Sequence, residues 1–534
     1  MAASDTTVPG RAAYDAVVIG SGPNGLVAAN LLADAGWEVL LVESQDTVGG
    51  AVRSDTTVHD GFIHDTFSSF YPLTAASPTL QRLDLEKHGL VWRHAPAVVG
   101  TPFDDGSWAM LHRDAAATAA GLDERSPGDG DTWLEMKRIW DVVKPSLIGA
   151  LLTPFPPVRH GLGLALRAPA VGGLAFFQLL LSSAQSVGER FNGEAARVLI
   201  GGNAGHADIP PTAPGSGLMG WLLCMLGHEV GWPVPEGGAG RLSQALADRF
   251  TAQGGQIRCG ARVVRVVVQA GRAVGVETDD GERISVRKAV VADVAAPRLY
   301  GGLVAWDDLP AKLCSRMQRF EWDPGTVKVD WALNGPIPWK GVPVSSPGTV
   351  HITEGMDHVV ITAAQIGAHT VPAEPLLLLG QMTTSDPTRS PQGTESAWAY
   401  THVPHEVRAD AGDGSIRGTW DHSDGERMAD RIQARVERYA PGFGSRVLSR
   451  RVLSPLDLQR LDENLEYGSL NGGTSSLHQQ LIFRPVPGLG RAETPVKGLY
   501  LGSASAHPGG GVHGGPGSNA ARAALAHARL RRSR

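Results

Sequence analysis

Cysteine is scarce in this chain, with three residues among 534, namely Cys224, Cys259 and Cys314. They lie far apart and form no Cys-x-x-Cys pair. This spacing is typical neither of a disulfide framework nor of a zinc site. We therefore expect three buried thiols, no bound metal and a reducing compartment, so the expected location is cytoplasmic.

Long runs of charge of one sign are also missing. The 48 Lys and Arg residues and the 54 Asp and Glu residues give a net charge of -6, and both signs are spread along the chain. Nucleic-acid binding needs basic side chains concentrated on one face. We therefore expect no nucleic-acid partner. The length and the 42% hydrophobic content indicate an ordinary globular enzyme of two or three domains.

An uninterrupted apolar run is lacking too. The segment GLGLALRAPAVGGLAFFQLLLSS, residues 161–183, is long enough to span a membrane, but Arg167 and Pro169 interrupt it. A spanning helix needs about 20 mainly apolar residues. We expect either a buried helical pair or an apolar cap that touches a lipid surface or an apolar substrate, with peripheral membrane contact through 146–183. The start, MAASDTTVPGRAAYD, resembles no targeting peptide, and we expect a short tail there.

The most informative stretch is VVIGSGPNGLVAANLLADAGWEVLLVES, residues 17–44. It predicts a strand at 15–20, a helix at 23–36 and a second strand at 38–43. Gly20 permits the tight turn, Gly22 lets the backbone approach a diphosphate, and Gly25 lets helix and strand pack closely. Glu43 ends the second strand, where a carboxylate accepts hydrogen bonds from ribose hydroxyls and repels a 2′-phosphate. The motif therefore predicts an ADP-containing cofactor, either FAD or NAD.

A second glycine motif, GGAVRS at 49–54, follows six residues after Glu43, and its Arg53 is available to pair with a phosphate. A cofactor that extends past its diphosphate needs such a second close approach of the backbone, which favours FAD. The two motifs together predict these cofactor-binding residues: Gly20, Ser21, Gly22, Pro23, Asn24, Gly25, Glu43, Ser44, Gly49, Gly50, Ala51 and Arg53.

Two later stretches complete the pattern of elements. Residues 256–300 alternate apolar with polar side chains and predict an antiparallel meander that turns at QAGR and DDGE and closes with the buried strand KAVVAD. GLYLGSAS, 498–505, predicts a strand that enters a glycine-rich loop, with a helix at about 516–530.

With these motifs on view, the chain resembles the FAD-dependent phytoene desaturase and phytoene dehydrogenase-related family, within the amine oxidase–carotenoid desaturase superfamily. The resemblance rests on the N-terminal block with VGGAVRS, on WPVPEGGAGRLSQALADRF, on the meander, and above all on GLYLGSASAHPGGGVHGGPGSNAARAAL. It implies that FAD is bound by the first and last pieces. No second strand–glycine–helix unit is present for a nicotinamide, so we expect the flavin to be resident.

The resemblance also assigns further residues. It implies that Val263 contacts the adenine through its backbone and that the loop Pro508–Gly514 places peptide N–H groups and a helix N-terminus near the pyrimidine end of the flavin. Such donors stabilise the negative charge of a reduced flavin. The further cofactor-binding residues expected here are Gly502, Ser503, Gly510, Gly511 and Val512.

The expected fold is α/β, a Rossmann-like FAD-binding domain of the glutathione-reductase type with an inserted α+β substrate domain. Three pieces, 12–75, 236–300 and 485–534, are expected to form the discontinuous FAD-binding domain. The insertions 76–235, mostly helical, and 301–484, of mixed strands and turns, are expected to form the substrate-binding cap.

Two residues are the candidates for catalysis. Lys328, in GTVKVDWALNGPIPW, lies in a block that resembles the stretch of amine oxidases carrying a lysine bridged by water to flavin N5; the alternative is a strand lysine that faces solvent. Among the histidines at 206, 228, 507 and 513, we select His513 as an acid or base because it lies in the C-terminal loop.

The expected reaction is hydride transfer at flavin N5 on a carbon–carbon bond of an apolar small-molecule substrate, as desaturation, saturation or isomerisation. Oxidation of an amine with release of hydrogen peroxide is the alternative, although Gly511 or Val512 stands where amine oxidases usually place an aromatic residue. A scaffold role for an FAD-binding protein is a third possibility. Oxygen and a quinone both stay open as electron acceptors.

Overall fold

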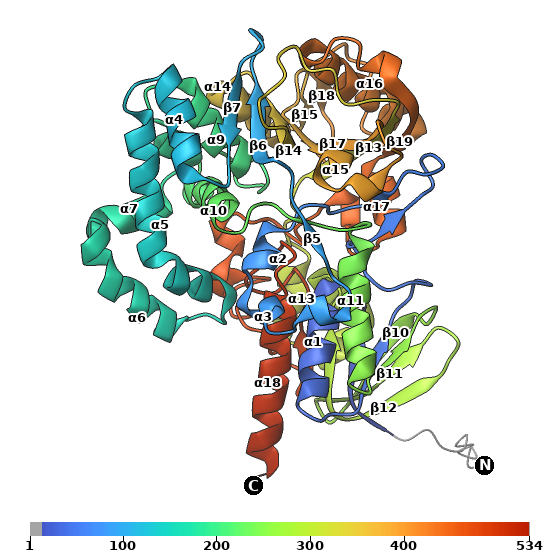
Figure 1. The fold of residues 1–534 in the computed structure, drawn as a ribbon. Helices are drawn as coiled ribbons and strands as arrows, with labels where there is room; N and C mark the ends of the chain where they lie inside the picture. The colour runs from blue at the N-terminus through green and yellow to red at the C-terminus, as the bar shows by residue number, and fades with distance from the viewer. Residues whose placement is uncertain (1–12, 533–534) are drawn as a thin grey trace, which may run out of the picture.

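A computed structural model describes residues 13–532, so residues 1–12 of the predicted N-terminal tail lie outside the described residues, while Tyr14 and Asp15 begin the first strand. The described chain contains two seven-stranded sheets and a group of helices beside them. Figure 1 shows the first sheet in the lower half, the second sheet at the upper right and the helices at the left. The α/β fold with a Rossmann-like unit predicted from the sequence is confirmed.

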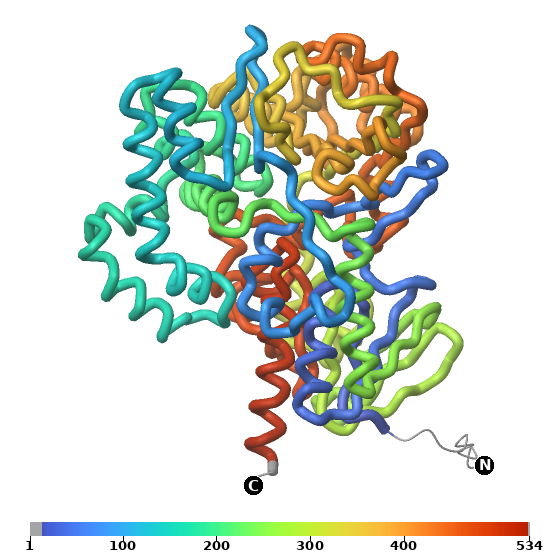
Figure 2. Tube along the Cα trace, viewed as in Figure 1, coloured from blue at the N-terminus to red at the C-terminus, as the bar shows by residue number. Residues whose placement is uncertain are grey.

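The first sheet begins with β1 (Tyr14–Ile19), helix α1 (Pro23–Asp34) and β2 (Val39–Val42). Strand β1 pairs in parallel with β2 and with β12 (Arg283–Ala292), and β12 pairs in parallel with β20 (Leu499–Leu501). Three segments far apart in the sequence thus run side by side. Figure 2 shows the blue, yellow-green and red parts of the chain together in the lower half of the molecule.

The predicted meander is correct for three strands and wrong for one. β10 (Val263–Gln269), β11 (Arg272–Thr278) and β12 pair antiparallel in order, with turns at the two predicted places. Strand β9 (Gln256–Arg258), however, pairs in parallel with β2. The reason is that β9 follows helix α11 (Gly240–Ala252), which returns the chain to the free edge of the parallel sheet.

Helices α1, α11 and α18 (Gly515–Arg532) cover one face of the parallel strands. On the other face, the side chains of the parallel strands share a core with α13 (Ala311–Met317) and with β10 and β11, which continue the same sheet beyond β12. Successive side chains of β1 alternate between the two cores, because neighbouring residues of a strand point to opposite faces. Residues of 301–317, which we assigned to the cap, pack in the second of these cores. The domain limits themselves stay a prediction.

The second sheet has the order β19-β13-β17-β16-β14-β6-β7. Its strands are β19 (Val447–Leu453), β13 (Gly325–Leu333), β17 (Glu395–Val403), β16 (Leu377–Gln381), β14 (Pro347–Ile352), β6 (Ala97–Pro102) and β7 (Trp108–Leu111). All neighbours are antiparallel except β14 and β6. Helix α16 (His422–Tyr439) packs on this sheet through its apolar stripe. Strands β6 and β7 therefore interrupt a segment that we expected to be mostly helical.

The helical group contains α5 (Asp129–Leu152), α9 (Glu194–Ala204) and α10 (Ser216–Glu229), which share a core with three fully buried tryptophans. At its edge, α6 (Val158–Arg167) and α7 (Leu174–Leu181) carry the apolar segment discussed above. No single helix of residues 13–532 has the length and apolar character to span a membrane; α6 with its extension to Val171 reaches them only together with α7, across a bend of 113°.

The expectation of a buried helical pair is wrong for one face of α6 and α7. The large apolar side chains exposed on the two helices are Val158, Leu162, Leu166, Leu174, Phe177 and Leu181. Leu164, Phe176 and Leu179 are buried in the helical core instead. The two short helices have apolar residues on more than one side, and the core contacts only one side.

Candidate functional site

A cavity of about 330 Å³ lies at the carboxyl ends of β1, β2 and β12. We call it the dinucleotide cavity. In open parallel sheets this edge is where ligands bind. Thirteen of the predicted cofactor residues line it, namely Gly20, Gly22, Pro23, Asn24, Glu43, Ser44, Gly50, Ala51, Arg53, Val263, Ser503, Gly511 and Val512.

Other predicted cofactor residues lie behind the wall and shape it. A Cβ atom on Gly25 would lie 2.1 Å from the carbonyl oxygen of Gly20, so only glycine permits this approach of helix and strand. The N–H of Gly49 donates to the carbonyl of Ser21 (3.0 Å), and Gly502 packs between β12 and α18. These residues do not line the cavity.

Glu43 is held at the end of β2 by the turn after β1. Its Oε2 accepts from the backbone N–H and the hydroxyl of Ser21 (2.8 and 2.7 Å), and its Oε1 accepts from the N–H of Gln45 (2.9 Å). The hydroxyl of Ser44 also donates to Oε1 (3.2 Å), so the about four acceptor positions of the carboxylate are in use. This longest of the four bonds is the one that a hydroxyl in the cavity would replace. This geometry fits the predicted contact with a ribose.

Two polar atoms at the same wall lack partners in the described part of the chain, namely Nε of Arg53 and Oδ1 of Asn24. The Arg53 guanidinium already donates to the carbonyl of Leu461 (2.8 Å) and lies over the ring of Phe67. Buried polar atoms are rarely left unpaired, so such atoms indicate a missing ligand. With the glycine turn and Glu43, they fit an ADP-containing cofactor.

A second cavity of about 290 Å³, which we call the chamber, meets the first at Ala51, Leu465, Leu470, Gly511 and Val512. Gly510 lines the chamber rather than the dinucleotide cavity. The walls of the chamber come mainly from the segment 67–74, from α10 and from β13 and β17 of the second sheet. The aromatic residues among them are Phe67, Phe70, Tyr71, Trp232, Trp398 and Tyr400.

Lys328 of β13 lines the chamber, and its side chain is only 4% exposed, which excludes the solvent-facing alternative. The ammonium donates to the carbonyl of Asp65 (2.9 Å) and pairs with Asp330. Burial lowers the pKa of Lys328, while the charge of Asp330 opposes that shift. Asp330 also pairs with Arg451 (2.8 Å), so the lysine belongs to a charged network.

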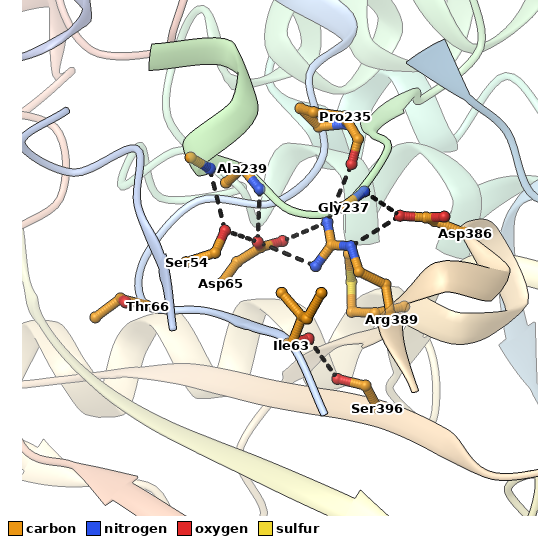
Figure 3. A network of polar contacts seen from close by, with 12 residues as sticks. Ser54, Ile63, Asp65, Thr66, Pro235, Gly237, Ala239, Asp386, Arg389 and Ser396 are labelled. Carbon is orange, nitrogen blue, oxygen red and sulfur yellow. Dashed lines mark hydrogen bonds and ion pairs between the residues drawn. The ribbon is translucent and has the colours of Figure 1, made fainter. Parts of the chain in front are cut away.

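A second buried network holds Asp65, whose carbonyl accepts the hydrogen bond from Lys328. The carboxylate of Asp65 accepts from the hydroxyl of Ser54 (2.8 Å), from the N–H of Ala239 (2.8 Å) and from Arg389 (3.1 Å). The guanidinium of Arg389 lies between Asp65 and Asp386, as Figure 3 shows. These contacts join strand β4 (His64–Asp65) to the start of α11, which holds the segment carrying the Asp65 carbonyl in place.

His513 does not line either cavity, which does not agree with its predicted role as a catalytic acid or base. Its Nδ1 accepts from the N–H of Gly515 at the start of α18 (3.0 Å), and its Nε2 lies 3.2 Å from the carbonyl oxygen of Gly510. Burial lowers its pKa to about 4, so the ring is neutral. Its position in the loop suggested proximity to the flavin, but both ring nitrogens are used to close the loop.

Other histidines line the chamber instead. Nε2 of His206 lies 2.9 Å from Nε2 of His351, and the hydroxyl of Tyr400 lies 3.5 Å from Nδ1 of His206. Burial lowers the pKa of His206 well below its usual value and that of His351 to about 3. His402 also lines the chamber, and burial lowers its pKa. The chamber therefore presents neutral imidazoles.

Sequence reasoning missed Tyr400 and His402, although a pattern could have revealed them. Trp398, Tyr400 and His402 alternate along β17, and alternate residues of a strand share one face. It also missed Asp293 at the end of β12, whose Oδ2 accepts from the N–H of Gly25 (2.7 Å). In the described residues, no cluster of three or more His, Cys, Asp or Glu side chains could hold a metal ion.

Comparison with known proteins supports the same cofactor. A model of the NAD(P)-binding Rossmann-like domain matches residues 18–83, and one of the flavin containing amine oxidoreductases matches 168–297. The chain is 30% identical to the mouse (Mus musculus) "pyridine nucleotide-disulfide oxidoreductase domain-containing protein 2", over 95% of this chain and 92% of that protein.

Two further matches concern named enzymes. The chain is 27% identical to the phytoene desaturase (lycopene-forming) of Pseudescherichia vulneris, over 95% of this chain and 98% of the enzyme. A solved structure of a putrescine oxidase variant is similar in fold, with a TM-score of 0.59, 18% identity, and coverage of 96% of this chain and 99% of that one.

Proposed function

Because the chain belongs to the amine oxidase–carotenoid desaturase superfamily of flavoproteins, we propose that it transforms a carbon–carbon bond of an apolar small molecule held in the chamber. The chain is an FAD-dependent oxidoreductase. The proposal concerns the substrate and the reaction, which is desaturation, saturation or isomerisation.

The residues of the dinucleotide cavity have distinct tasks in this proposal. The turn at Gly20 and Gly22 and the N-terminus of α1 would hold the diphosphate, and Glu43 would hold the ribose. Val263 at the start of β10 would contact the adenine, and Gly511 lies where the cavity meets the chamber. FAD, when bound, supplies hydride acceptance or donation at the flavin N5.

The observation that carries the proposal is the charge of the chamber. In the described part of the chain, its lining includes no Asp or Glu, and Lys328 is the only lysine or arginine. The ammonium of Lys328 is paired with Asp330, which does not line the chamber. An ammonium substrate would therefore lose its hydration and find no carboxylate in the lining to compensate, which is unfavourable. A neutral apolar molecule meets aromatic and aliphatic walls instead.

The polar residues of the chamber are suited to orienting a neutral substrate rather than to binding a charged one. Lys328 has three N–H donors, and the carbonyl of Asp65 and the carboxylate of Asp330 account for two of them. One donor remains for a water or a substrate atom. Tyr400 pairs with Lys328 across β13 and β17, so its hydroxyl lies on the same wall. This hydroxyl and the neutral His206 and His402 are available to hold a proton in the chamber.

We also propose that α6 and α7 rest on a membrane surface, from which an apolar substrate would enter the protein. Their exposed leucines and Arg159 and Arg167 support this contact, since apolar and basic side chains together favour an interfacial position. Within this proposal, oxygen and a membrane quinone are the electron acceptors to compare.

The test is an anaerobic titration of the purified holoprotein, followed by flavin absorbance. Polyenes, retinoids, fatty acyl compounds and amines are added to the oxidised protein, and unsaturated compounds are added to the dithionite-reduced protein. Bleaching by an apolar compound, or reoxidation by an alkene, supports the proposal. Bleaching by an amine, with peroxide formed on admission of air, would establish amine oxidation, and no response to any compound would favour the scaffold role.

A further inference from the structure

Helix α1 is capped by a residue that is distant in sequence. Its N-cap position is Gly22, which has no side chain to accept a hydrogen bond. The carboxyl of Asp293 takes this place, since its Oδ2 accepts from the N–H of Gly25 (2.7 Å) across 268 residues. A Cβ atom on Gly22 would lie 2.6 Å from the same oxygen, so this glycine leaves room for the acid. Asp293 also lines the dinucleotide cavity.

The surroundings of Asp293 are acidic. Glu43 at the end of β2 and Asp462 line the same cavity, and both act on Asp293 through their charges. A diphosphate that binds at the glycine turn must approach these three carboxyls. If all three carboxyls were ionised, they would repel the negatively charged diphosphate and oppose its binding, because charges interact strongly where water is largely excluded.

The basic groups nearby do not neutralise Asp293. Arg262 and Arg298 pair with Glu463 (2.7 and 3.3 Å), and Arg53 donates to the carbonyl of Leu461, while its Nε, without a partner in the described chain, keeps a donor at the cavity wall. No lysine or arginine in the described residues forms an ion pair with Asp293. Burial, reinforced by Asp462 and Glu43, raises the pKa of Asp293 to about 8, although the bond from Gly25 opposes the shift.

We propose that Asp293 binds the diphosphate of FAD as a neutral acid. One carboxyl oxygen keeps the N–H of Gly25, and the other carries the proton and donates to a phosphate oxygen. The glycine turn then gains a hydrogen-bond donor without gaining a positive charge. Loss of that proton replaces an attractive contact with a repulsive one, so the affinity for FAD depends on the protonation of this residue.

The experiment is a titration of the apoprotein with FAD, followed by quenching of flavin fluorescence, from about pH 6 to about pH 9.5. For the wild-type protein we expect a constant Kd below the pKa of Asp293 and a rise of about tenfold per pH unit above about pH 8. A Kd that stays flat over the whole range would contradict the proposal without any variant.

Asp293→Asn is the matched variant. Asparagine caps helices as well as aspartate does, so the bond from Gly25 is retained, and its amide donates at every pH. We expect the variant to bind FAD with a Kd that does not change with pH. A rise parallel to that of the wild type would assign the effect to another group. Circular dichroism at each pH shows whether the apoprotein stays folded, and no substrate is needed, so the result is independent of the proposed reaction.

Discussion

Lys328 is buried at the chamber wall, where its ammonium contacts Asp330 and the carbonyl of Asp65. The sequence alone did not show whether this side chain faces solvent or the interior. The structure assigns it a fixed position, since Asp330 is in turn held by Arg451. A change of this lysine should therefore alter the chamber more than the fold.

For Lys328→Met we expect FAD to be retained and turnover or flavin reoxidation to slow by about tenfold or more, because a preorganised donor at the chamber is lost. Asp330 keeps Arg451 as its partner, which limits the loss of stability. Stopped-flow absorbance measures the rate. The exposed Lys340 supplies the control Lys340→Met, and equal rates in both variants would show that Lys328 has no part in the reaction.

At the scale of elements, the loop before α18 depends on a buried arginine. Arg484 is 1% exposed and donates to the carbonyls of Asn471, Thr474 and Ala504 (2.7, 2.9 and 2.7 Å). It therefore joins two segments that form the wall where the cavities meet. Burial lowers its pKa to about 10, which still leaves it charged at neutral pH.

Arg484→Met should leave these carbonyls without a buried donor, and we expect a loss of about 3 kcal/mol in stability together with release of FAD. Arg484→Lys should recover only part of this, because an ammonium cannot reach the same carbonyls as a planar guanidinium. Differential scanning fluorimetry and the flavin content of the purified variants measure both effects. The exposed Arg491 gives the control Arg491→Met, and a flavin content of Arg484→Met equal to that control would refute the role.

Helices α6 and α7 carry the predicted membrane contact. In the triple variant Leu162→Glu, Leu166→Glu and Leu174→Glu, we expect flotation with vesicles of phosphatidylcholine and phosphatidylglycerol to fall at least about tenfold, since burial of each leucine is worth about 2 kcal/mol. The FAD content should not change, because these side chains are exposed. Val344→Glu, at an exposed site in the loop between β13 and β14, is the control. Failure of the wild-type protein to float would disprove the contact.

At the scale of the whole molecule, buried acids set part of the pH dependence of stability. Glu395 of β17 accepts from the N–H of Thr383 (2.6 Å) and the hydroxyl of Thr384 (2.7 Å), and burial raises its pKa to about 7. A raised pKa means that the folded state holds the proton more tightly than the unfolded state. This contribution to stability is present below the unfolded value of 4.5 and is lost as the pH rises towards about 7.

Glu395→Gln removes this titration. Its amide oxygen can keep the bond from the N–H of Thr383, and its amide NH2 takes the place of the oxygen that accepts from the Thr384 hydroxyl, which can turn and accept instead. We expect the Tm of the variant, relative to the wild type, to increase by a few degrees between about pH 4.5 and about pH 7. Thermal melts of both holoproteins across that range measure the difference. Other titrating groups cancel in the comparison, so a constant difference in Tm would show that Glu395 keeps an ordinary pKa.

Local features were predictable because their parts lie close together in the sequence. Gly20, Gly22, Gly25 and Glu43 lie within one strand–helix–strand unit, and the chain between them has few ways to fold. The meander turns and the strand before the C-terminal loop followed from alternation and turn residues. These segments determined the α/β class and the ADP-containing cofactor, and the resemblance they carry implied FAD.

The tertiary structure alone decided which side chains surround the cavities. Asp293 reaches the glycine turn from 268 residues away, and the chamber unites β13 and β17 with α10. The directions of Lys328 and His513 and the exposed face of α6 followed from packing against segments remote in sequence. Periodicity reports which side of an element is apolar, whereas the identity of the neighbour on each side depends on the assembled fold.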